Sequence, residues 1–470
     1  MEHINSQTLT KRLTLSVVAA CLISFCGLIT ETAVNIAFPK IMADFPISTA
    51  TVQWLTTGNL LIVAMVTPLS AFLQKRFRIR TLFLFSAICF ILGCLLALAA
   101  PNFAILLLAR LIQGISTGVG VPIAFHIILN QIPYEKTGTF MGFGALVSAA
   151  APALGPTFGG MVVSTLGWRY IFVLLLPVLI ITVILGLCTI RETGQTEKIP
   201  VDVLGILWIM AAFFCLVLGF ANIAQIQERP VFVVVLLALG LICLFFFARH
   251  CAEAKQPLVE ISVFRNAAFD CHLIAFFLIN AIMLGASFLL PNYTQVVIGA
   301  ASFTAGLILL PGALLNAGAG PISGMILDRF GPKFPILSGN ILMAVSVILF
   351  TCLGMHLTTT LVFVLYLLFG IGCGMAFGST MTVGMLRLSP EMKPYGNTAF
   401  NTLMQFAGAV GTCVAAACVS LSQNNAAPEQ YPTKTAEGSV HGFLFLAILA
   451  VVSVLLQIGG FWNFERKQKI

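Results

Sequence analysis

The sequence has very little charge. Lysine, arginine, aspartate and glutamate together make up 9% of its 470 residues, whereas a soluble protein carries roughly 25%. A soluble enzyme or binding domain of this length is therefore excluded. Hydrophobic residues make up 59% of the chain, and apolar runs of about 20 residues, long enough to cross a bilayer as helices, recur from end to end. The composition predicts an all-α polytopic membrane protein.

Signatures of other protein classes are also missing. The chain has no H-E-x-x-H stretch and no P-loop, so we expect neither an enzyme nor an ATP-driven pump. Its 13 cysteines fall almost entirely within apolar runs and lack metal-ligand spacing, which predicts no disulfide framework, metal or cofactor. The net charge of +8 comes from short loops between the runs, so membrane topology explains it better than a nucleic-acid partner does.

The distribution of positive charge predicts which ends of the runs face the cytoplasm. With the N-terminus inside and fourteen spans, only Lys40, Arg169, Arg229 and Lys434 of the 24 lysines and arginines fall outside, and Arg110 lies within a span. Such asymmetry marks the cytoplasmic side, so both termini are expected there. The predicted spans are 13–38, 51–73, 80–100, 103–130, 138–163, 169–190, 203–223, 230–248, 269–291, 302–327, 334–355, 358–386, 397–421 and 441–463.

An internal repeat divides these spans into two sets. The stretch "SAFLQKRFRIR" (70–80) follows the second span, and "SGMILDRFGPK" (323–333) follows the tenth. Each stretch ends the second span of a six-span block, so two copies are expected with two helices inserted between them. The expected domains are an N-terminal six-helix bundle (1–190), the inserted helices with cytoplasmic linkers (191–268) and a C-terminal six-helix bundle (269–470). Two such halves around a site at the membrane midplane are typical of transporters.

Six short motifs, taken in order, carry a resemblance to a known family. They are "QWLTTGNLL" (53–61), "RLIQG" (110–114), "PALGPTFGG" (152–160), "GWRYIF" (167–172), "QPLVEISVFRNAAF" (256–269) and "GMILDRFGPK" (324–333). Together they resemble the 14-span drug:proton antiporter family of the major facilitator superfamily, over nearly the whole chain. The resemblance implies a major facilitator fold of two six-helix bundles plus two extra central helices.

The same resemblance implies a function and a place in the cell. It implies a monomeric multi-pass protein of the bacterial cytoplasmic membrane that exports lipophilic drugs or toxic organic compounds by alternating access. Its partners would be a drug-like small molecule, protons and the lipid bilayer. A proton-coupled transporter of the same fold for a specific metabolite remains the alternative. A receptor is disfavoured because the longest external loop, expected at 422–440, is too short for a ligand-binding domain.

Glu31 is the one acidic residue deep within a predicted span. An ionised carboxylate there costs about 2.5–3.5 kcal/mol or more, so Glu31 must be protonated, paired or hydrated. Counting from the outer ends of the first and fourth spans places Glu31 and Arg110 at similar depths, about 12 Å and about 10 Å. The residues that share the helix face of Glu31 form a polar stripe expected to line a cavity: Ser24, Gly27, Leu28 and Asn35.

Glu31 and Arg110 are expected to be the proton-coupling residues. A low-dielectric environment favours the protonated carboxyl, whereas a nearby guanidinium favours the ionised form. A site balanced between these effects binds a proton or a cation but not both, and antiport requires such exclusion. A purely structural ion pair between the two spans is the alternative. The family's first-span motif places Thr30 at its acidic position, so the resemblance alone does not assign that role to Glu31, which lies about 100° further around the helix.

The remaining candidate residues fall into three groups. The resemblance implies an antiporter motif that limits leakage, for which close helix packing is the alternative: Gly155, Pro156, Gly159 and Gly160. It also implies a conformational latch in the two repeated loops: Gln74, Arg78, Asp328, Arg329, Gly331 and Lys333. The first loop departs from the family pattern at Gln74 and Phe77, where acid and glycine are usual. Candidate substrate contacts, with helix–helix hydrogen bonding as the alternative for the last three, are Thr30, Asn35, Asn280, Asn316 and Gln405.

Overall fold

The computed structural model describes residues 11–192, 202–223, 226, 228–254, 260–389, 392–424 and 426–468, and this part of the chain contains no β-strand. The long helices are α1 (Lys11–Asp44), α3 (Trp54–Arg76), α4 (Ile79–Leu98), α5 (Phe103–Gln131), α6 (Tyr134–Thr165), α7 (Tyr170–Thr189), α8 (Val203–Ala221), α9 (Pro230–Glu253), α10 (Ala267–Val296), α11 (Ser302–Phe330), α12 (Lys333–Leu353), α13 (Thr359–Leu386), α14 (Lys393–Gln423) and α15 (Tyr431–Gln468). The short elements are α2 (Thr49–Val52), η2 (Ile261–Arg265) and η3 (Pro428–Gln430).

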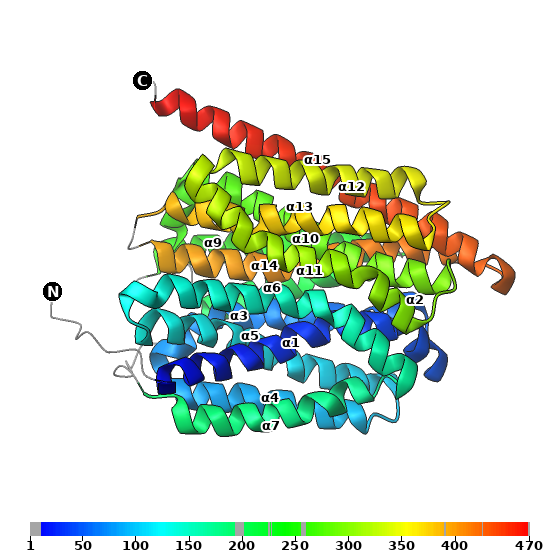
Figure 1. Ribbon diagram of the computed structural model, residues 1–470, viewed down its shortest axis with the longest axis horizontal. Helices are drawn as coiled ribbons and strands as arrows, with labels where there is room; N and C mark the ends of the chain where they lie inside the picture. Colours follow the sequence, from blue (N-terminus) through cyan, green and yellow to red (C-terminus); the bar gives the residue numbers. More distant parts are fainter. Residues whose placement is uncertain are drawn as a thin grey trace.

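Each predicted span lies largely within one long helix, and these helices run side by side along the length of the molecule (Figure 1). The all-α fold is thus confirmed. Within the described residues, 13 helices are long and apolar enough to cross a membrane. The helix at the predicted span 138–163, α6, is not among them, so the count of fourteen spans stays a prediction.

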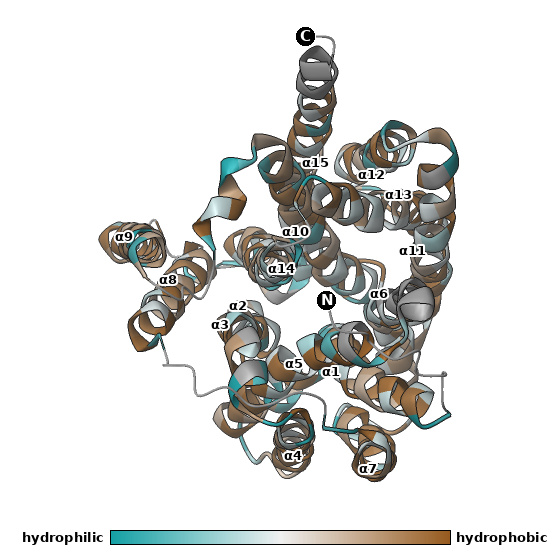
Figure 2. Cartoon of the chain, turned by 90° about the vertical axis from the view of Figure 1, so that its left-hand side faces the viewer, coloured by the Kyte–Doolittle hydropathy of each residue, from teal (hydrophilic) through white to brown (hydrophobic). Residues whose placement is uncertain are grey.

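The helices form two groups that face each other in the view along their axes (Figure 2). One group contains α1–α7, and the other contains α10–α15. We call these groups the N-terminal half and the C-terminal half. The largest contacts between the halves are those of α6 with α11, of α3 with α14, and of α1 with α10. The domain boundaries near 190 and 269 remain a prediction.

The α8–α9 hairpin lies outside the two halves and covers the junction of α3 and α14 (Figure 2). Phe213 of α8 stacks on Phe406 of α14, with ring centroids 5.0 Å apart. At one end of the hairpin, Asp202 and His250 make a contact of 2.6 Å that ties α8 to α9. Because α8 packs against α3 as well as α14, the hairpin contacts both halves.

The two halves are joined by contacts at one end of the molecule, which we call the closed end. Thr49 of α2 donates a hydrogen bond of 2.8 Å to Gln423 of α14 and lies 3.3 Å from the hydroxyl of Tyr431. The rings of Phe38 (α1) and Phe288 (α10) pack with centroids 6.1 Å apart. Thr57 lies 3.4 Å from Cys413, and Thr157 donates to the carbonyl of Gly306, so further contacts between the halves lie toward this end. The structure is therefore one state of a molecule whose halves meet at one end.

The interpretation of 422–440 as an external loop is wrong for its second part, because α15 begins at Tyr431. Thr435 and Ser439 are buried although they are polar, since each hydroxyl donates to the carbonyl four residues earlier on the same helix. A Cβ on Gly438 would lie 2.6 Å from Cα of Val419, so α14 and α15 pack very closely here. Small residues and self-satisfied hydroxyls allow this polar stretch to be a packed helix.

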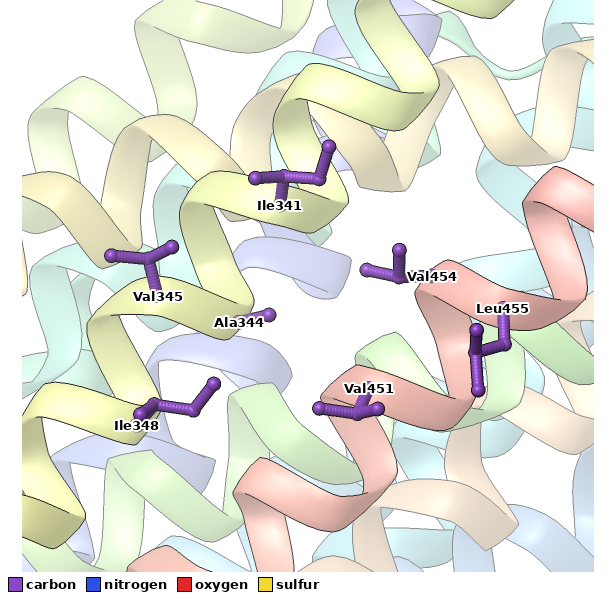
Figure 3. A pocket seen from close by; sticks show the side chains of 7 residues that line it. All are labelled: Ile341, Ala344, Val345, Ile348, Val451, Val454 and Leu455. Atoms are coloured by element: carbon purple, nitrogen blue, oxygen red, sulfur yellow. The ribbon is translucent and has the colours of Figure 1, made fainter.

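A groove between α12 and α15 is lined by apolar side chains alone (Figure 3). Ile341 and Leu455, two of its lining residues, are exposed on the outer face of the helices. A groove on this face with no polar group suits lipid chains better than a drug that must be oriented by hydrogen bonds.

Candidate functional site

Glu31 and Arg110 both lie inside the N-terminal half, on α1 and α5. Glu31 is 3% exposed and Arg110 is 1% exposed. The two helices approach closely: a Cβ on Gly27 of α1 would lie 2.5 Å from the hydroxyl of Thr117 on α5. Arg110 is close enough to act on Glu31 electrostatically, yet no salt bridge among the described residues joins them. The structure thus places the two predicted residues near each other, but they form no salt bridge.

Neutral groups hold Arg110 instead. Its Nε donates to the carbonyl of Leu55 on α3 at 3.1 Å, and its Nη1 donates to Oε1 of Gln113 at 2.7 Å. Its Nη2 has no hydrogen-bond partner in the described part of the chain. The carbonyl of Arg110 accepts in turn from Nδ2 of Asn59 at 2.8 Å. Both the side chain and the backbone of Arg110 therefore bind α5 to α3.

Sequence reasoning missed Gln113 as the partner of Arg110. The signal was present in "RLIQG", since residues three apart on a helix share a face. The carbonyl of Leu55 could not be found in this way, because every residue carries such a group and only the packing of α3 against α5 selects it.

The polar stripe of α1 packs against protein instead of lining an open cavity. Ser24 lies 3.4 Å from the carbonyl of Gly120 on α5, and Asn35 accepts a hydrogen bond of 2.7 Å from Thr56 on α3. Both residues are buried. The stripe therefore fixes α1 to its neighbours on either side of Glu31.

The predicted antiporter motif of α6 contacts the turn of α1 that carries Glu31. Thr32 donates a hydrogen bond of 2.9 Å to the carbonyl of Pro152. A Cβ on Gly155 would lie 2.8 Å from the carbonyl of Ile29, and one on Gly159 would lie 2.6 Å from that of Ala33. Backbone lies against backbone here, so only glycine leaves room.

The opposite face of α6 contacts the C-terminal half. Thr157 donates a hydrogen bond of 3.0 Å to the carbonyl of Gly306 on α11. A Cβ on Gly306 would lie 2.6 Å from the carbonyl of Pro156, and one on Gly160 would meet the backbone of Ser302. The motif therefore connects the Glu31 turn directly to the other half.

We expect Gly159→Ala to destabilise the protein by about 1–3 kcal/mol, because the new methyl group would push α6 away from the backbone of α1. Gly318→Ala is the matched control, since Gly318 is also helical but a Cβ added there would have no neighbouring atom within 4 Å. Thermal unfolding of the detergent-purified proteins measures both. Equal stability of the two variants would contradict the close packing of α6 on α1.

Four of the five candidate substrate contacts, Asn35 among them, have other partners in the structure. Thr30 donates to the carbonyl of Cys26 on its own helix. Asn280 likewise donates to Phe276, at 3.1 Å, and the amide of Asn316 lies 3.8 Å from Sδ of Met283. Gln405 is buried on α14. No hydrogen bond given for the described residues joins two of these side chains, and their contact with substrate stays a prediction.

The two latch loops form similar turns with different backbone conformations. Phe77 donates its N–H to Leu73 at 2.8 Å, and Gly331 donates its N–H to Leu327 at 3.0 Å. Gly331 has φ of 79°, which favours glycine, whereas Phe77 has φ of −117°, which any residue adopts. The departure at Phe77 therefore has a local physical reason.

The charged latch residues lie at the ends of these helices. Arg78 precedes α4 and is exposed, as is Arg329 in the last turn of α11. Gln74 is half-buried near the end of α3, and Lys333 begins α12. The side chain of Asp328 lies outside the described part of the chain. The latch itself stays a prediction.

Residues 20–412 match the profile of the Major Facilitator Superfamily. The chain is 35% identical over 449 residues to "Lincomycin resistance protein LmrB" of Bacillus subtilis (strain 168), covering 93% of this chain and 94% of that protein. It is 26% identical over 400 residues to "Multidrug resistance protein B homolog" of Mycobacterium tuberculosis (strain ATCC 25618 / H37Rv), covering 84% of this chain and 74% of the relative. These bacterial relatives and the apolar helices make it a multi-pass protein of the bacterial plasma membrane.

Solved structures show the same fold. A bacterial homologue of the human lysosomal transporter Spinster, titled as inward-facing and occupied, has a TM-score of 0.70 at 15% identity, covering 98% of this chain and 99% of that one. An auto-inhibited peptide transporter of the POT family has a TM-score of 0.67 at 13% identity, with 97% of each chain covered. The family profile and the drug-resistance relatives show that the chain belongs to the major facilitator superfamily and to its drug:proton antiporter family, and that it is a transporter and not an enzyme.

Proposed function

We propose that this protein exports lipophilic drugs or toxic organic compounds across the cytoplasmic membrane in exchange for protons. The observation that carries the proposal is a buried carboxylate, Glu31, beside a buried guanidinium, Arg110, with no salt bridge closing them among the described residues. Burial favours proton uptake by such a carboxylate, and the guanidinium favours proton release. The names of the lincomycin and multidrug resistance relatives support drugs as the substrate class.

The transport cycle we propose is alternating access by a monomer. With both termini in the cytoplasm, the closed end faces outward, and this state receives substrate from the cytoplasm. Protonation or deprotonation of Glu31 acts on α1, and α6 and α3 transmit the change. Both helices contact the neighbourhood of the pair and also the C-terminal half, α6 through Gly306 and α3 through a 3.4 Å contact of Thr57 with Cys413. The contacts of α6 with α11 and of α3 with α14 then open together.

We expect the driving force to depend on the charge of the substrate. One titratable carboxylate in the spans suggests one proton per cycle, so exchange with a monovalent cation moves no net charge. Exchange with a neutral drug moves one charge, and the membrane potential then contributes about 2.3 kcal/mol per 100 mV. This energy corresponds to roughly 50-fold in the accumulation ratio.

Proteoliposomes with an imposed potential and no pH gradient provide the test. A quaternary ammonium dye should show little response to potential, whereas a neutral lipophilic drug should accumulate strongly. A strong response of the dye would mean that more than one proton moves per cycle. The single-carboxylate mechanism would then be abandoned.

A further inference from the structure

The guanidinium of Arg110 makes its hydrogen bonds to uncharged acceptors although a carboxylate is near. Gln113 accepts from Nη1, and the carbonyl of Leu55 accepts from Nε. A carboxylate is a stronger acceptor for a guanidinium than an amide is, because the hydrogen bond is charge-assisted on both sides. Gln113 thus holds the guanidinium through Nη1, while Nη2 has no hydrogen-bond partner in the described part of the chain.

The position of Gln113 is fixed from α4. Gln113 is fully buried, and its Nε2 lies 3.4 Å from Sγ of Cys94. Its side chain crosses Gly93, where a Cβ would lie 2.5 Å from Cγ of Gln113 and 2.9 Å from the carbonyl of Ala109. A side chain at position 93 would therefore displace Gln113 or move α4 away from α5.

We propose that Gln113 competes with Glu31 for Arg110 and thereby sets the pH range in which transport is coupled to protons. Gly93 takes part because its lack of a side chain leaves room for the side chain of Gln113. Both are positioning residues, and the inference rests on the function proposed above. While Glu31 is protonated, Arg110 donates its hydrogen bond to Gln113. When Glu31 is ionised, the guanidinium turns toward the carboxylate and its hydrogen bond to the amide of Gln113 breaks.

Few titratable groups surround this exchange. Arg110 of α5 is the charged group that acts on Glu31, and Glu31 of α1 and Cys94 of α4 act on Arg110. Cys26 of α1 lies near Cys94, and thiols are mainly neutral at physiological pH. From α3 come a carbonyl and the amide of Asn59. The residues of α6 that pack on the Glu31 turn carry no titratable side chain: Pro152, Gly155 and Gly159. The competition is therefore between one carboxylate and one amide for one cation.

Two substitutions at position 113 should move the pH profile of transport in opposite directions. Gln113→Leu removes the amide acceptor, so Arg110 stabilises ionised Glu31 and a higher proton concentration is needed to protonate it. We expect the profile to move to lower pH by about one unit. Gln113→Glu adds a charged acceptor that retains Arg110, so we expect a move of about one unit to higher pH. Proton-coupled drug transport in proteoliposomes measures both.

Gly93→Ala should shift the profile in the same direction as Gln113→Leu, because it displaces the amide. Gly219→Ala in α8 is the control, since its Cβ would lie 2.7 Å from the side chain of Leu237, far along the chain from the pair. We expect no shift there. For any variant that no longer transports, the pH dependence of drug binding to the purified protein gives the same comparison.

Glu31→Gln, measured alongside, separates the two levels of inference. If Glu31→Gln loses coupling but both Gln113 variants keep the wild-type profile or shift in the same direction, Gln113 serves packing only and the inference is overturned. If Glu31→Gln keeps proton-coupled transport, the proposed function fails and the competition fails with it.

Discussion

Replacing Glu31 by glutamine is expected to abolish active efflux while the protein still reaches the membrane. Glutamine keeps the shape of the side chain but cannot take up or release a proton. Glu31 is buried, and it is the one acidic residue deep within a predicted span. Its replacement therefore removes the carboxylate that we expect to carry the proton. Drug accumulation in a pump-deficient bacterial host should rise to the level of cells without the transporter, and membrane abundance should be unchanged by immunoblotting.

Thr30→Ala is the matched control for this prediction. Thr30 occupies the acidic position of the family motif, but its hydroxyl binds the carbonyl of Cys26 within its own helix. Its removal should therefore leave most of the efflux intact. If instead Thr30→Ala abolishes efflux and Glu31→Gln leaves efflux unchanged, a group other than Glu31 carries the proton.

Linking the two halves across the closed end is expected to stop transport completely and reversibly. Thr49 and Gln423 are in hydrogen-bond contact across the halves, so cysteines at both positions can be bridged by a short bifunctional thiol reagent with a cleavable linker. The bridge holds α2 and α14 together, and alternating access requires them to separate. Efflux should fall to background after bridging and return after cleavage. The background should be a functional variant without its 13 native cysteines.

A second cysteine pair at the same end tests whether the effect comes from joining the halves. Gln423 also donates a hydrogen bond of 2.8 Å to Thr435, and both residues belong to the C-terminal half. Bridging positions 423 and 435 should leave efflux nearly unchanged. Continued transport with positions 49 and 423 fully bridged would show that the closed end does not open during the cycle.

The sequence predicted most of the fold because membrane spans are determined by local composition. Apolar runs of sufficient length must be helical in lipid, since every backbone polar group has to be satisfied within the segment. The exception at 431–440 is instructive. Its serine and threonine side chains look like those of a loop, but in the structure their hydroxyls bind backbone carbonyls and the segment is buried helix.

The candidate site was predicted less fully, because it depends on contacts between helices. Glu31 and Arg110 stand out as charges in apolar spans, and counting residues placed them at similar depth. The sequence could not indicate that no salt bridge would join them, because this depends on how Gln113 of α5 packs against α4. It also could not indicate that glycines of α6 contact the Glu31 turn on one side and α11 on the other.

The hydrogen bond from Arg110 to the carbonyl of Leu55 has a consequence for how this transporter tolerates genetic change. A main-chain carbonyl is present whatever amino acid occupies position 55, so no single codon change there deletes the acceptor. The amide of Gln113 has no such protection, since one substitution removes it. Mutation at position 113 can therefore change the hydrogen bonding of Arg110 within α5, whether by drift or under selection by new drugs. The hydrogen bond of Arg110 to α3 persists in either case.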